Sequence, residues 1–409
     1  MLKHVAAERL TLGMFIHEPD ASWMDYPDWK TRFLLTDRIE LENLKASGVR
    51  AFIIDTDRGV DADMAPVPAR AASPGSNGAA AKPVLQEKCS AEEEFGRAGA
   101  IVGKARKSVG EILKQARLGK AVDLGRTLPV IEEISASIDR NASALVSYVR
   151  IKAADEYTYL HSVAVCALMI NLGRQLLFDD DGLAELGTAG LLHDIGKSAV
   201  SAELITRKGP LTAEEMAEVR QHTVRGAELL SRSRNISDVI VDVALNHHER
   251  IDGRGYPHNL SGERISLPAR MAAVCDVYDA MTSQRSYKEA EQPAEALAEM
   301  FASKGQFAEP VLAAFIRSVG IYPIGSLVRL KSGRLAVVVD QNVDELTKPQ
   351  VRVFYSIARQ TRLAPMHLDL SRDGEDEILS REKPERWGFA QWHVLWAQLM
   401  GGKAKRLAA

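Results

Sequence analysis

The sequence is poor in cysteine and has no long apolar run. Its three cysteines, Cys89, Cys166 and Cys275, form no CxxC pair, which predicts reduced, buried thiols rather than a disulfide framework. No stretch approaches the roughly 18 apolar residues that a membrane-spanning helix needs. The first 15 residues also lack the apolar core of a signal peptide. We therefore expect a cytoplasmic protein that makes no membrane contact.

An excess of charge of either sign is also missing. Lysine and arginine number 52 against 55 acidic residues, which leaves a formal charge of −3. This balance gives no general attraction for a nucleic acid polymer, so an anionic ligand has to be held by a local cluster. The sequence also lacks a P-loop, a G-x-G-x-x-G fingerprint and a motif for a nucleophilic serine or cysteine. The enzyme classes that depend on these motifs are therefore disfavoured.

Composition and periodicity predict a mainly α protein with six parts. A small α+β domain over residues 1–60 contains a buried strand at 51–57, and an Ala-, Pro-, Gly- and Ser-rich flexible linker follows over 61–88. Connecting helices over 89–140 lead into a helical bundle over 141–320. The apolar period then changes to two in a small β-rich region over 321–372, with a hairpin around the KSGR turn. A C-terminal helix and tail occupy 373–409.

Two tryptophans mark one face of the predicted C-terminal helix. Trp392 and Trp396 are four residues apart and therefore lie on the same side of a helix. We expect this face to pack in the protein core or in a homodimer rather than against a membrane, and the sequence leaves open which of the two applies.

Five of the ten histidines stand at intervals that suit a helical bundle. The gaps between them, and from the last of them to a later aspartate, are 25 to 32 residues, which is about one helix and its connection each. Bundles build metal sites from side chains on facing helices. Buried His and Asp residues in apolar helices are costly unless they are paired or metal-bound. The candidate metal ligands are His161, His193, Asp194, His222, His247, His248 and Asp276.

Taken singly, several of these residues have an ordinary structural explanation. A lone histidine inside a helix, such as His222, is more often a hydrogen-bonded core residue than a ligand. Asp276 is equally well explained as a structural hydrogen-bond acceptor, although Asp279 lies three residues further along nearly the same helix face. The adjacent His193 and Asp194, near the end of an apolar helix, are harder to explain without a metal. Jointly, the seven residues predict a metal centre.

Three motifs resemble one known family. LLHDIGK (191–197) is similar to the motif of HD phosphohydrolases, and NHHERIDGRGYP (246–257) resembles the extension that names the HD-GYP family of bacterial cyclic-di-GMP phosphodiesterases. RMAAVCDVYDAMTSQRSYK (270–288) is similar to the helix and phosphate-contact segment that close this domain, and the resemblance covers roughly 140–320. Residues 1–60 resemble a domain of unknown function that precedes some HD-GYP modules.

The resemblance implies a site for two divalent metal ions, iron or manganese, formed by the seven candidate residues with Asp194 as the bridging ligand. A hydroxide that bridges the metals would hydrolyse cyclic di-GMP to the linear dinucleotide pGpG, and further hydrolysis to GMP is left open. Some members hold a third metal through a glutamate one turn before the first histidine. Tyr157 stands at that position here, so we expect two metals rather than three.

Further residues are candidates for substrate binding. Lys197 shares the face of His193 if the helix continues, and would then serve catalysis by binding a phosphate oxygen; the alternative is a solvated lysine at a helix end. The resemblance implies phosphate contacts for Arg285 and Lys288, whereas their sequence context alone indicates a solvated loop. In the loop, Gly253 and Gly255 permit positive φ. The loop residues that would hold the substrate are Gly255, Tyr256 and Pro257, with packing of Tyr256 beneath the loop as the alternative.

Two other functions remain open at this point. An HD hydrolase of another nucleotide would share the metal ligands, although the glycine loop and the segment with Arg285 and Lys288 favour a cyclic dinucleotide. A signalling adaptor would bind cyclic di-GMP, or a protein partner through the GYP loop or the N-terminal domain, without turnover. A complete set of seven ligands disfavours the adaptor, because a protein that only binds has no need of them.

Overall fold

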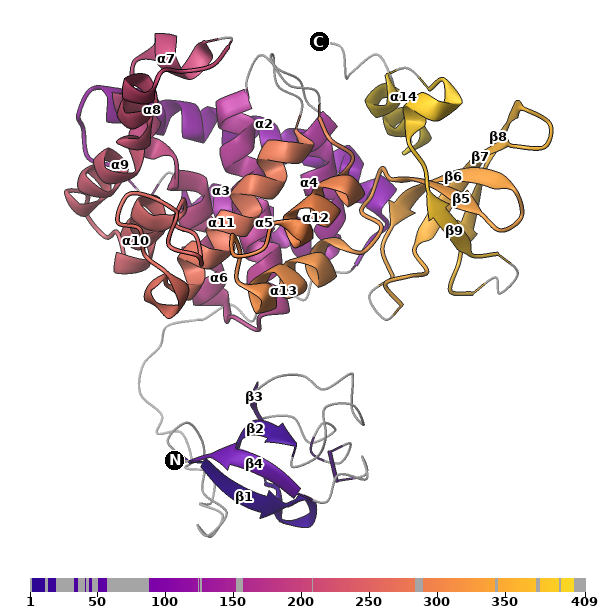
Figure 1. Cartoon of the computed structure of the whole chain (residues 1–409), viewed down its shortest axis with the longest axis horizontal. Helices are drawn as coiled ribbons and strands as arrows, with labels where there is room; N and C mark the ends of the chain where they lie inside the picture. The colour runs from indigo at the N-terminus through magenta and orange to yellow at the C-terminus, as the bar shows by residue number, and fades with distance from the viewer. Residues whose placement is uncertain are drawn as a thin grey trace, which may run out of the picture. The chain divides into compact units, whose positions relative to one another are not determined.

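The chain forms two compact units, Met1–Pro83 and Val84–Ala409 (Figure 1). This computed structural model describes residues 2–11, 14–19, 33–35, 41, 44–45, 51–56, 88–123, 125, 127–151, 157–207, 209–283, 290–342, 345–372, 376–389 and 391–400. Apart from Lys88, the predicted linker over 61–88 lies outside the described residues. Each unit is treated by itself below.

The N-terminal unit contains an antiparallel four-stranded sheet in the order β1-β4-β2-β3. Its strands are β1 (Leu2–Ala6), β2 (Phe15–Pro19), β3 (Phe33–Leu34) and β4 (Ala51–Asp55), and the short helix η1 (Ala7–Arg9) follows β1. The strand predicted at 51–57 is therefore present as β4. Phe52 and Ile54 are fully buried and belong to a small apolar core with Leu10 and Ile16, as the two-residue period of a strand with one buried face requires.

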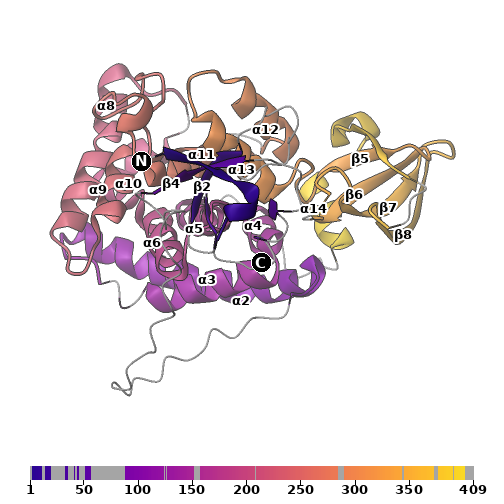
Figure 2. The same ribbon diagram turned by 90° about the horizontal axis from the view of Figure 1, so that it is seen from below.

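The second unit is dominated by a helical body (Figures 1 and 2). Its helices are α2 (Ala91–Arg117), α3 (Leu128–Arg140), α4 (Ala142–Ile151), α5 (Tyr157–Gln175), α6 (Asp180–Leu192), η4 (Ile195–Ala199), α7 (Ala202–Thr206), α8 (Ala213–Arg220), α9 (His222–Ser231), α10 (Asp238–Asn246), η5 (Gly262–Arg264), α11 (Leu267–Thr282), α12 (Pro293–Ala302) and α13 (Glu309–Val319).

Two of these helices, α5 and α11, form the centre of the body. Every side chain from Leu160 to Asn171 is buried, and α11 is buried over most of its length. A helix that is apolar on all sides is stable only when other helices surround it. α6, α4 and α13 pack on α5, α12 and α10 pack on α11, and the two central helices contact each other. Polar groups on α5 and α11 are consequently held away from bulk water.

α3 and α4 are separated by the single residue Asn141. Asn141 has an extended backbone, and its Oδ1 accepts hydrogen bonds from the backbone N–H groups of Ser143 and Ala144. An asparagine side chain that satisfies the first donors of a helix favours a new helix start at that point. The same residue donates through Nδ2 to Asp340, which links the helical body to the C-terminal sheet.

The C-terminal part of this unit is a five-stranded antiparallel sheet in the order β8-β7-β6-β5-β9. Its elements are β5 (Leu327–Leu330), β6 (Arg334–Asp340), β7 (Gln350–Ser356), β8 (Thr361–Asp369), β9 (Ile378–Arg381), η6 (Pro384–Trp387) and α14 (Trp392–Leu399). The hairpin predicted around KSGR is β5 and β6. The fifth strand, β9, lies beyond residue 372, so the sheet continues into the part of the sequence where we expected only a helix and tail.

The tryptophan face of α14 packs in the core. Trp396 contacts Phe95 of α2, and both belong to an apolar cluster shared with the sheet. The Nε1 of Trp392 donates a hydrogen bond to the carbonyl oxygen of Gly325 at 2.8 Å. Of the two explanations for this face, core packing is therefore the one realised. Among the described helices, none combines the length and the apolar character needed to cross a bilayer.

Candidate metal centre

The seven candidate ligands come from different helices and meet at one place in the helical body. His161 lies in the first turns of α5, and Asp276 lies in the middle of α11. The remaining five stand at helix ends. They are His193 and Asp194 after α6, His222 at the start of α9, and His247 and His248 after α10.

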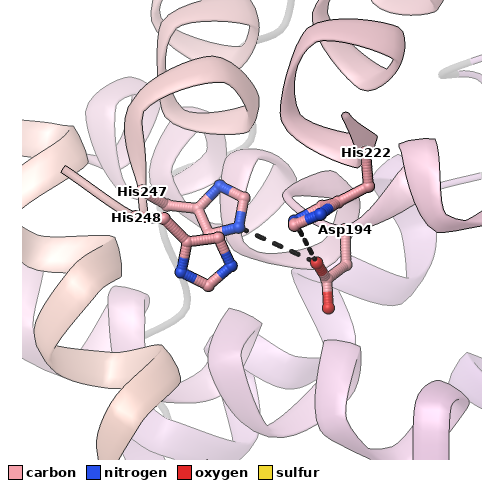
Figure 3. A group of neighbouring side chains, drawn as sticks. All are labelled: Asp194, His222, His247 and His248. Carbon is pink, nitrogen blue, oxygen red and sulfur yellow. Dashed lines mark ion pairs between the residues drawn. The ribbon is translucent and has the colours of Figure 1, made fainter. Parts of the chain in front are cut away.

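Their ligand atoms form two groups, in each of which all atoms lie within 4.8 Å of one another. One group is Asp194, His222, His247 and His248, drawn in Figure 3. The other group is His161, His193 and Asp276. All are buried except His248, which is partly buried.

Asp194 stands between the two groups. Its Oδ1 lies 3.3 Å from Nε2 of His222 and 3.7 Å from Nε2 of His247 (Figure 3). Its Oδ2 faces the other group, at 3.4 Å from Nε2 of His193 and 3.7 Å from Nε2 of His161. One carboxylate therefore presents a different oxygen to each group, which is the arrangement required of a bridging ligand.

Hydrogen bonds within the protein orient three of the imidazoles. Nδ1 of His193, His222 and His247 lies 2.7, 2.7 and 2.9 Å from a backbone carbonyl oxygen three or four residues earlier in the chain. A carbonyl only accepts, so each Nδ1 carries the proton and each Nε2 is left with a free lone pair. These three Nε2 atoms and Oδ1 of Asp194 are buried without a hydrogen-bond partner among the described residues.

Unpaired buried acceptors of this kind cost free energy unless something occupies them. Four such acceptors point into one cluster that also contains three further His and Asp ligands. Imidazole and carboxylate together suit divalent Fe, Mn, Zn or Ni. The residues present therefore fit a divalent metal centre, while the donor set does not select one element.

His161 differs from the other imidazoles because both of its ring nitrogens face carboxylates. Nδ1 lies 2.7 Å from Oδ2 of Asp279, and Nε2 lies 3.0 Å from Oδ1 of Asp276. Burial acts to lower the pKa of His161, but the hydrogen bonds to Asp276 and Asp279 outweigh it and raise the pKa to about 9. A cation at Nε2 and Asp276 would take the place of this proton.

The carboxylates of the cluster are ionised. Burial alone would raise the pKa of Asp194, but Lys197 and the neighbouring imidazoles outweigh it and hold the pKa well below its ordinary value. The pKa of Asp276 is likewise lowered, because its hydrogen bond with His161 outweighs its burial. Burial lowers the pKa of His248 well below its ordinary value, which favours the neutral, metal-binding form.

The helix does not continue to Lys197, so Lys197 does not share the helix face of His193. The α-helix ends at Leu192, and the chain continues as the 3-10 helix η4. Lys197 nevertheless contacts Asp194, three residues before it, through an ion pair between Nζ and Oδ2. Lys197 therefore reaches the candidate ligands through the turn of η4 and not through a helix face shared with His193.

Gly196 explains why the helix ends before Lys197. A Cβ atom on Gly196 would lie 1.9 Å from the carbonyl oxygen of His222 and 2.5 Å from the backbone nitrogen of Gly226. The backbone of η4 thus lies directly against α9. This close approach brings His222, which is the first residue of α9 and not a mid-helix residue as predicted, next to Asp194.

The glycine-rich loop is held close to the histidine pair. A Cβ atom on Gly255 would lie 2.4 Å from Cα of Glu249, so only glycine permits this close approach of the two backbone segments. Of the two glycines expected to adopt positive φ, Gly253 does so and Gly255 does not. The carboxylate of Glu249 accepts hydrogen bonds from the backbone N–H groups of His258 at 2.7 Å and Leu260 at 3.0 Å. Pro257, which immediately precedes His258, follows a cis peptide bond.

Tyr256 lies beside the imidazoles and not away from them beneath the loop. Its ring centroid is 4.7 Å from that of His248 and 6.4 Å from that of His222. Burial raises the pKa of its hydroxyl above the ordinary value, so the hydroxyl keeps its proton. The two predicted phosphate contacts, Arg285 and Lys288, lie outside the described residues.

Two residues that orient this site were absent from the predicted set. Asp279 accepts from His161, and its Oδ1 also accepts from the hydroxyl of Ser283 at 2.9 Å. Its three-residue spacing from Asp276 was the signal that could have identified it. Glu249 is buried and holds the loop, and nothing in its sequence context distinguishes it from a solvated glutamate.

The helical fold and the buried His/Asp cluster define an HD-type hydrolase. Residues 135–310 match the family model of the HD domain, and residues 2–127 match that of a domain of unknown function, DUF3391. The second match spans the N-terminal sheet and α2, and thus extends beyond the residues 1–60 that resembled such a domain.

Curated relatives are phosphodiesterases. The chain is 44% identical over 402 residues to a cyclic di-GMP phosphodiesterase of Pseudomonas aeruginosa, which covers 98% of this chain and 96% of the relative. It is 36% identical over 186 residues to the cyclic di-GMP phosphodiesterase response regulator RpfG of Xanthomonas campestris, covering 45% of this chain and 49% of the relative. It is 39% identical over 137 residues to a 3'3'-cGAMP-specific phosphodiesterase of Vibrio cholerae, covering 32% of this chain and 26% of the relative.

The chain belongs to the HD-GYP family of bacterial cyclic-di-GMP phosphodiesterases. The near-complete match to the Pseudomonas relative confirms the resemblance expected from the three motifs, and the mainly α fold is confirmed with it.

Proposed function

We propose that this protein is a metal-dependent phosphodiesterase that hydrolyses cyclic di-GMP to pGpG. The observation that carries this proposal is the set of three buried Nε2 atoms and one carboxylate oxygen that have no hydrogen-bond partner among the described residues and that belong to the clustered candidate ligands. The full-length similarity to a cyclic di-GMP phosphodiesterase supports the choice of substrate.

In this proposal, His161, His193 and Asp276 would hold one divalent ion, His222, His247 and His248 would hold a second, and Asp194 would contribute a ligand to each. Iron or manganese is the proposed metal. When bound, two such ions supply positive charge that attracts a phosphodiester and stabilises its transition state, and they lower the pKa of a bound water.

The residues of the chain prepare this site before substrate arrives. The carbonyl groups that accept from His193, His222 and His247 fix the direction of each Nε2, and Asp279 does the same for His161. Such partners orient the ligands and raise their basicity. The buried position of the cluster keeps bulk water from competing with the phosphate.

Lys197 is the proposed protein contact to the scissile phosphate. Its side chain is 29% exposed and its ammonium group pairs with Asp194, so it lies at the metal cluster and can turn to a phosphate oxygen. Arg285 and Lys288 are proposed to bind the substrate phosphates as well. Hydrolysis adds a water oxygen to phosphorus and breaks the bond to the 3′ oxygen, which takes up a proton, and pGpG is left with a 5′ phosphate.

The remaining predictions extend this proposal to the cell. We propose that the enzyme acts in the cytoplasm, that the GYP loop or the N-terminal domain binds a protein partner, and that the protein forms a homodimer. Light scattering of the purified protein measures its mass and tests the homodimer directly.

Activity of the metal-loaded protein tests the main proposal. Protein purified without oxygen and loaded with Fe(II) or Mn(II) is incubated with cyclic di-GMP, and pGpG and GMP are separated by chromatography. We expect linear product from the wild type and from His393→Ala, which alters an exposed histidine on α14. We expect none from the double variant His193→Ala/Asp194→Ala. Tight binding of cyclic di-GMP without any linear product would show an adaptor instead of an enzyme.

A further inference from the structure

An arginine stands at the outer side of Tyr256. Arg220 is the last residue of α8 and is exposed, and the centre of its guanidinium group lies 4.9 Å from the centroid of the Tyr256 ring. Tyr256 in turn lies 4.7 Å from the ring of His248. The three groups form a row that begins at a candidate metal ligand and ends at a cation.

Among the described residues, the guanidinium group of Arg220 has no hydrogen-bond acceptor for its N–H groups. Within the part of the chain that the structure describes, it makes no ion pair and no side-chain hydrogen bond. Neighbouring arginines behave differently, because Arg207 pairs with Glu215 and Arg225 pairs with Glu218. A guanidinium carries five donors in a planar fork, and at Arg220 the aromatic contact orients this fork and leaves its donors available.

The place of Arg220 suits a nucleobase better than the scissile phosphate. The phosphate belongs at the metal ligands, where the unpaired Nε2 atoms and Lys197 lie. In a nucleotide the base is separated from the phosphorus by a ribose. The ring of Tyr256 contacts both His248 and Arg220, so a nucleotide whose phosphate lies at the metal ligands and whose base follows the ring of Tyr256 would place that base at Arg220.

We propose that Arg220 reads the base of the substrate by donating two hydrogen bonds to O6 and N7 of a guanine. Guanine presents two acceptors on this edge, whereas adenine presents one acceptor and an amino donor, so a bidentate arginine distinguishes the two bases. This inference rests on the proposed function and adds the residue that selects guanine within it.

The contact makes a specific prediction for a mixed substrate. 3'3'-cGAMP, the substrate in the name of the Vibrio relative, contains one guanine and one adenine and therefore two different phosphodiester bonds. If Arg220 holds the guanine, only one of these bonds lies at the metals. We expect one linear isomer, pGpA or pApG, in roughly ten- to hundredfold excess over the other, which is the discrimination of a good bidentate contact.

The ratio of the two isomers is the decisive measurement, because it does not depend on how much enzyme is folded or metal-loaded. We expect Arg220→Ala to bring the ratio close to one. We expect Arg220→Lys to do the same while keeping most of the rate, because lysine keeps the charge and loses the fork. Arg232→Ala alters an exposed arginine at the end of α9 and is expected to leave the ratio unchanged.

Three results overturn the inference. Equal amounts of the two isomers from the wild type would show that no base is read. An unchanged ratio in Arg220→Ala with a lower rate on all substrates would assign Arg220 to a phosphate instead. If Arg220→Ala has the wild-type rate and the wild-type isomer ratio, then Arg220 takes no part in substrate binding. Failure of the proposed function is distinct, since the wild-type enzyme would then hydrolyse neither cyclic di-GMP nor 3'3'-cGAMP.

Discussion

Replacement of Gly196 by alanine tests whether the approach of η4 to α9 builds the metal centre. The new methyl carbon would start 1.9 Å from the carbonyl oxygen of His222, and ordinary van der Waals contact begins at 3.4 Å. The obstructing atom is backbone, which cannot rotate away. The two segments must therefore separate by roughly 1 Å or more, and overpacking of this kind costs about 1–3 kcal/mol of folding free energy.

The same displacement moves His222 relative to Asp194. In the wild type, Nε2 of His222 lies 3.3 Å from Oδ1 of Asp194. A misplacement of about 1 Å in an active site reduces rates by roughly a hundredfold. We expect Gly196→Ala to unfold at a lower denaturant concentration than the wild type and to bind less metal. We also expect its rate of cyclic di-GMP hydrolysis to fall by about two orders of magnitude. Urea titration, metal analysis and product chromatography measure the three effects.

Gly103→Ala is the matched control. Gly103 lies in α2, and nothing lies within 4 Å of the position of an added Cβ. Alanine is a better helix former than glycine, so this variant should gain about 0.5–1 kcal/mol in stability and keep its activity. If Gly196→Ala instead retains wild-type stability, metal content and rate, then the close backbone approach does not position His222 and our explanation of this site is wrong.

Three further predictions concern buried carboxylates. Asp279→Ala should lower metal content and turnover by about 10- to 100-fold with unchanged circular dichroism, because His161 loses its orienting acceptor; undiminished metal affinity would contradict this. Glu249→Gln should raise the KM for cyclic di-GMP more than it lowers kcat, because it weakens the anchor of the GYP loop, whereas Glu263→Gln, at an exposed position, should change neither constant. Glu94 is buried and pairs with Arg140 at 2.7 Å; burial acts to raise its pKa, but the hydrogen bonds from Arg140 and Ser137 outweigh it, and the pKa is lowered. Its contribution to stability is therefore present above the unfolded pKa of about 4.5 and is lost as the pH falls through the lower folded pKa. Glu94→Gln should cost about 3–5 kcal/mol at pH 7 and less in acid, and an equal cost at both pH values would refute the assignment.

Much of the site was predictable because its chemistry is local. Two pairs of candidate ligands, His193–Asp194 and His247–His248, are adjacent in the sequence. Each pair follows an apolar helix, where burial of a polar or charged side chain costs free energy unless the side chain is paired. The intervals between the histidines predicted ligands from different helices, and the structure brings α5, α6, α9, α10 and α11 together, although η4, α7 and α8 lie between His193 and His222. β5 and β6 were predicted as the hairpin around KSGR for the same reason, since their apolar period is visible in the sequence.

Features that depend on contacts between distant segments were not predictable. The sequence indicated a helix end near His193 and Asp194, but it did not indicate that Gly196 lies directly against the carbonyl group of His222. β8 was missed because most of its side chains are exposed, which removes the apolar alternation that marks a strand. The place of Arg220 beside Tyr256 joins two segments that no spacing rule connects.

The amino-acid sequence by itself predicted which residues are candidate metal ligands and the family to which the chain belongs, because these predictions follow from residue type and short spacing. The family resemblance implied a bridging place for Asp194. The tertiary structure alone decided which of its oxygens faces each group of ligands, that Gly255 serves a close approach, and that Asp279 and Glu249 hold the site in position. These facts depend on distances between segments that are far apart in sequence, and such distances arise only when the helices pack.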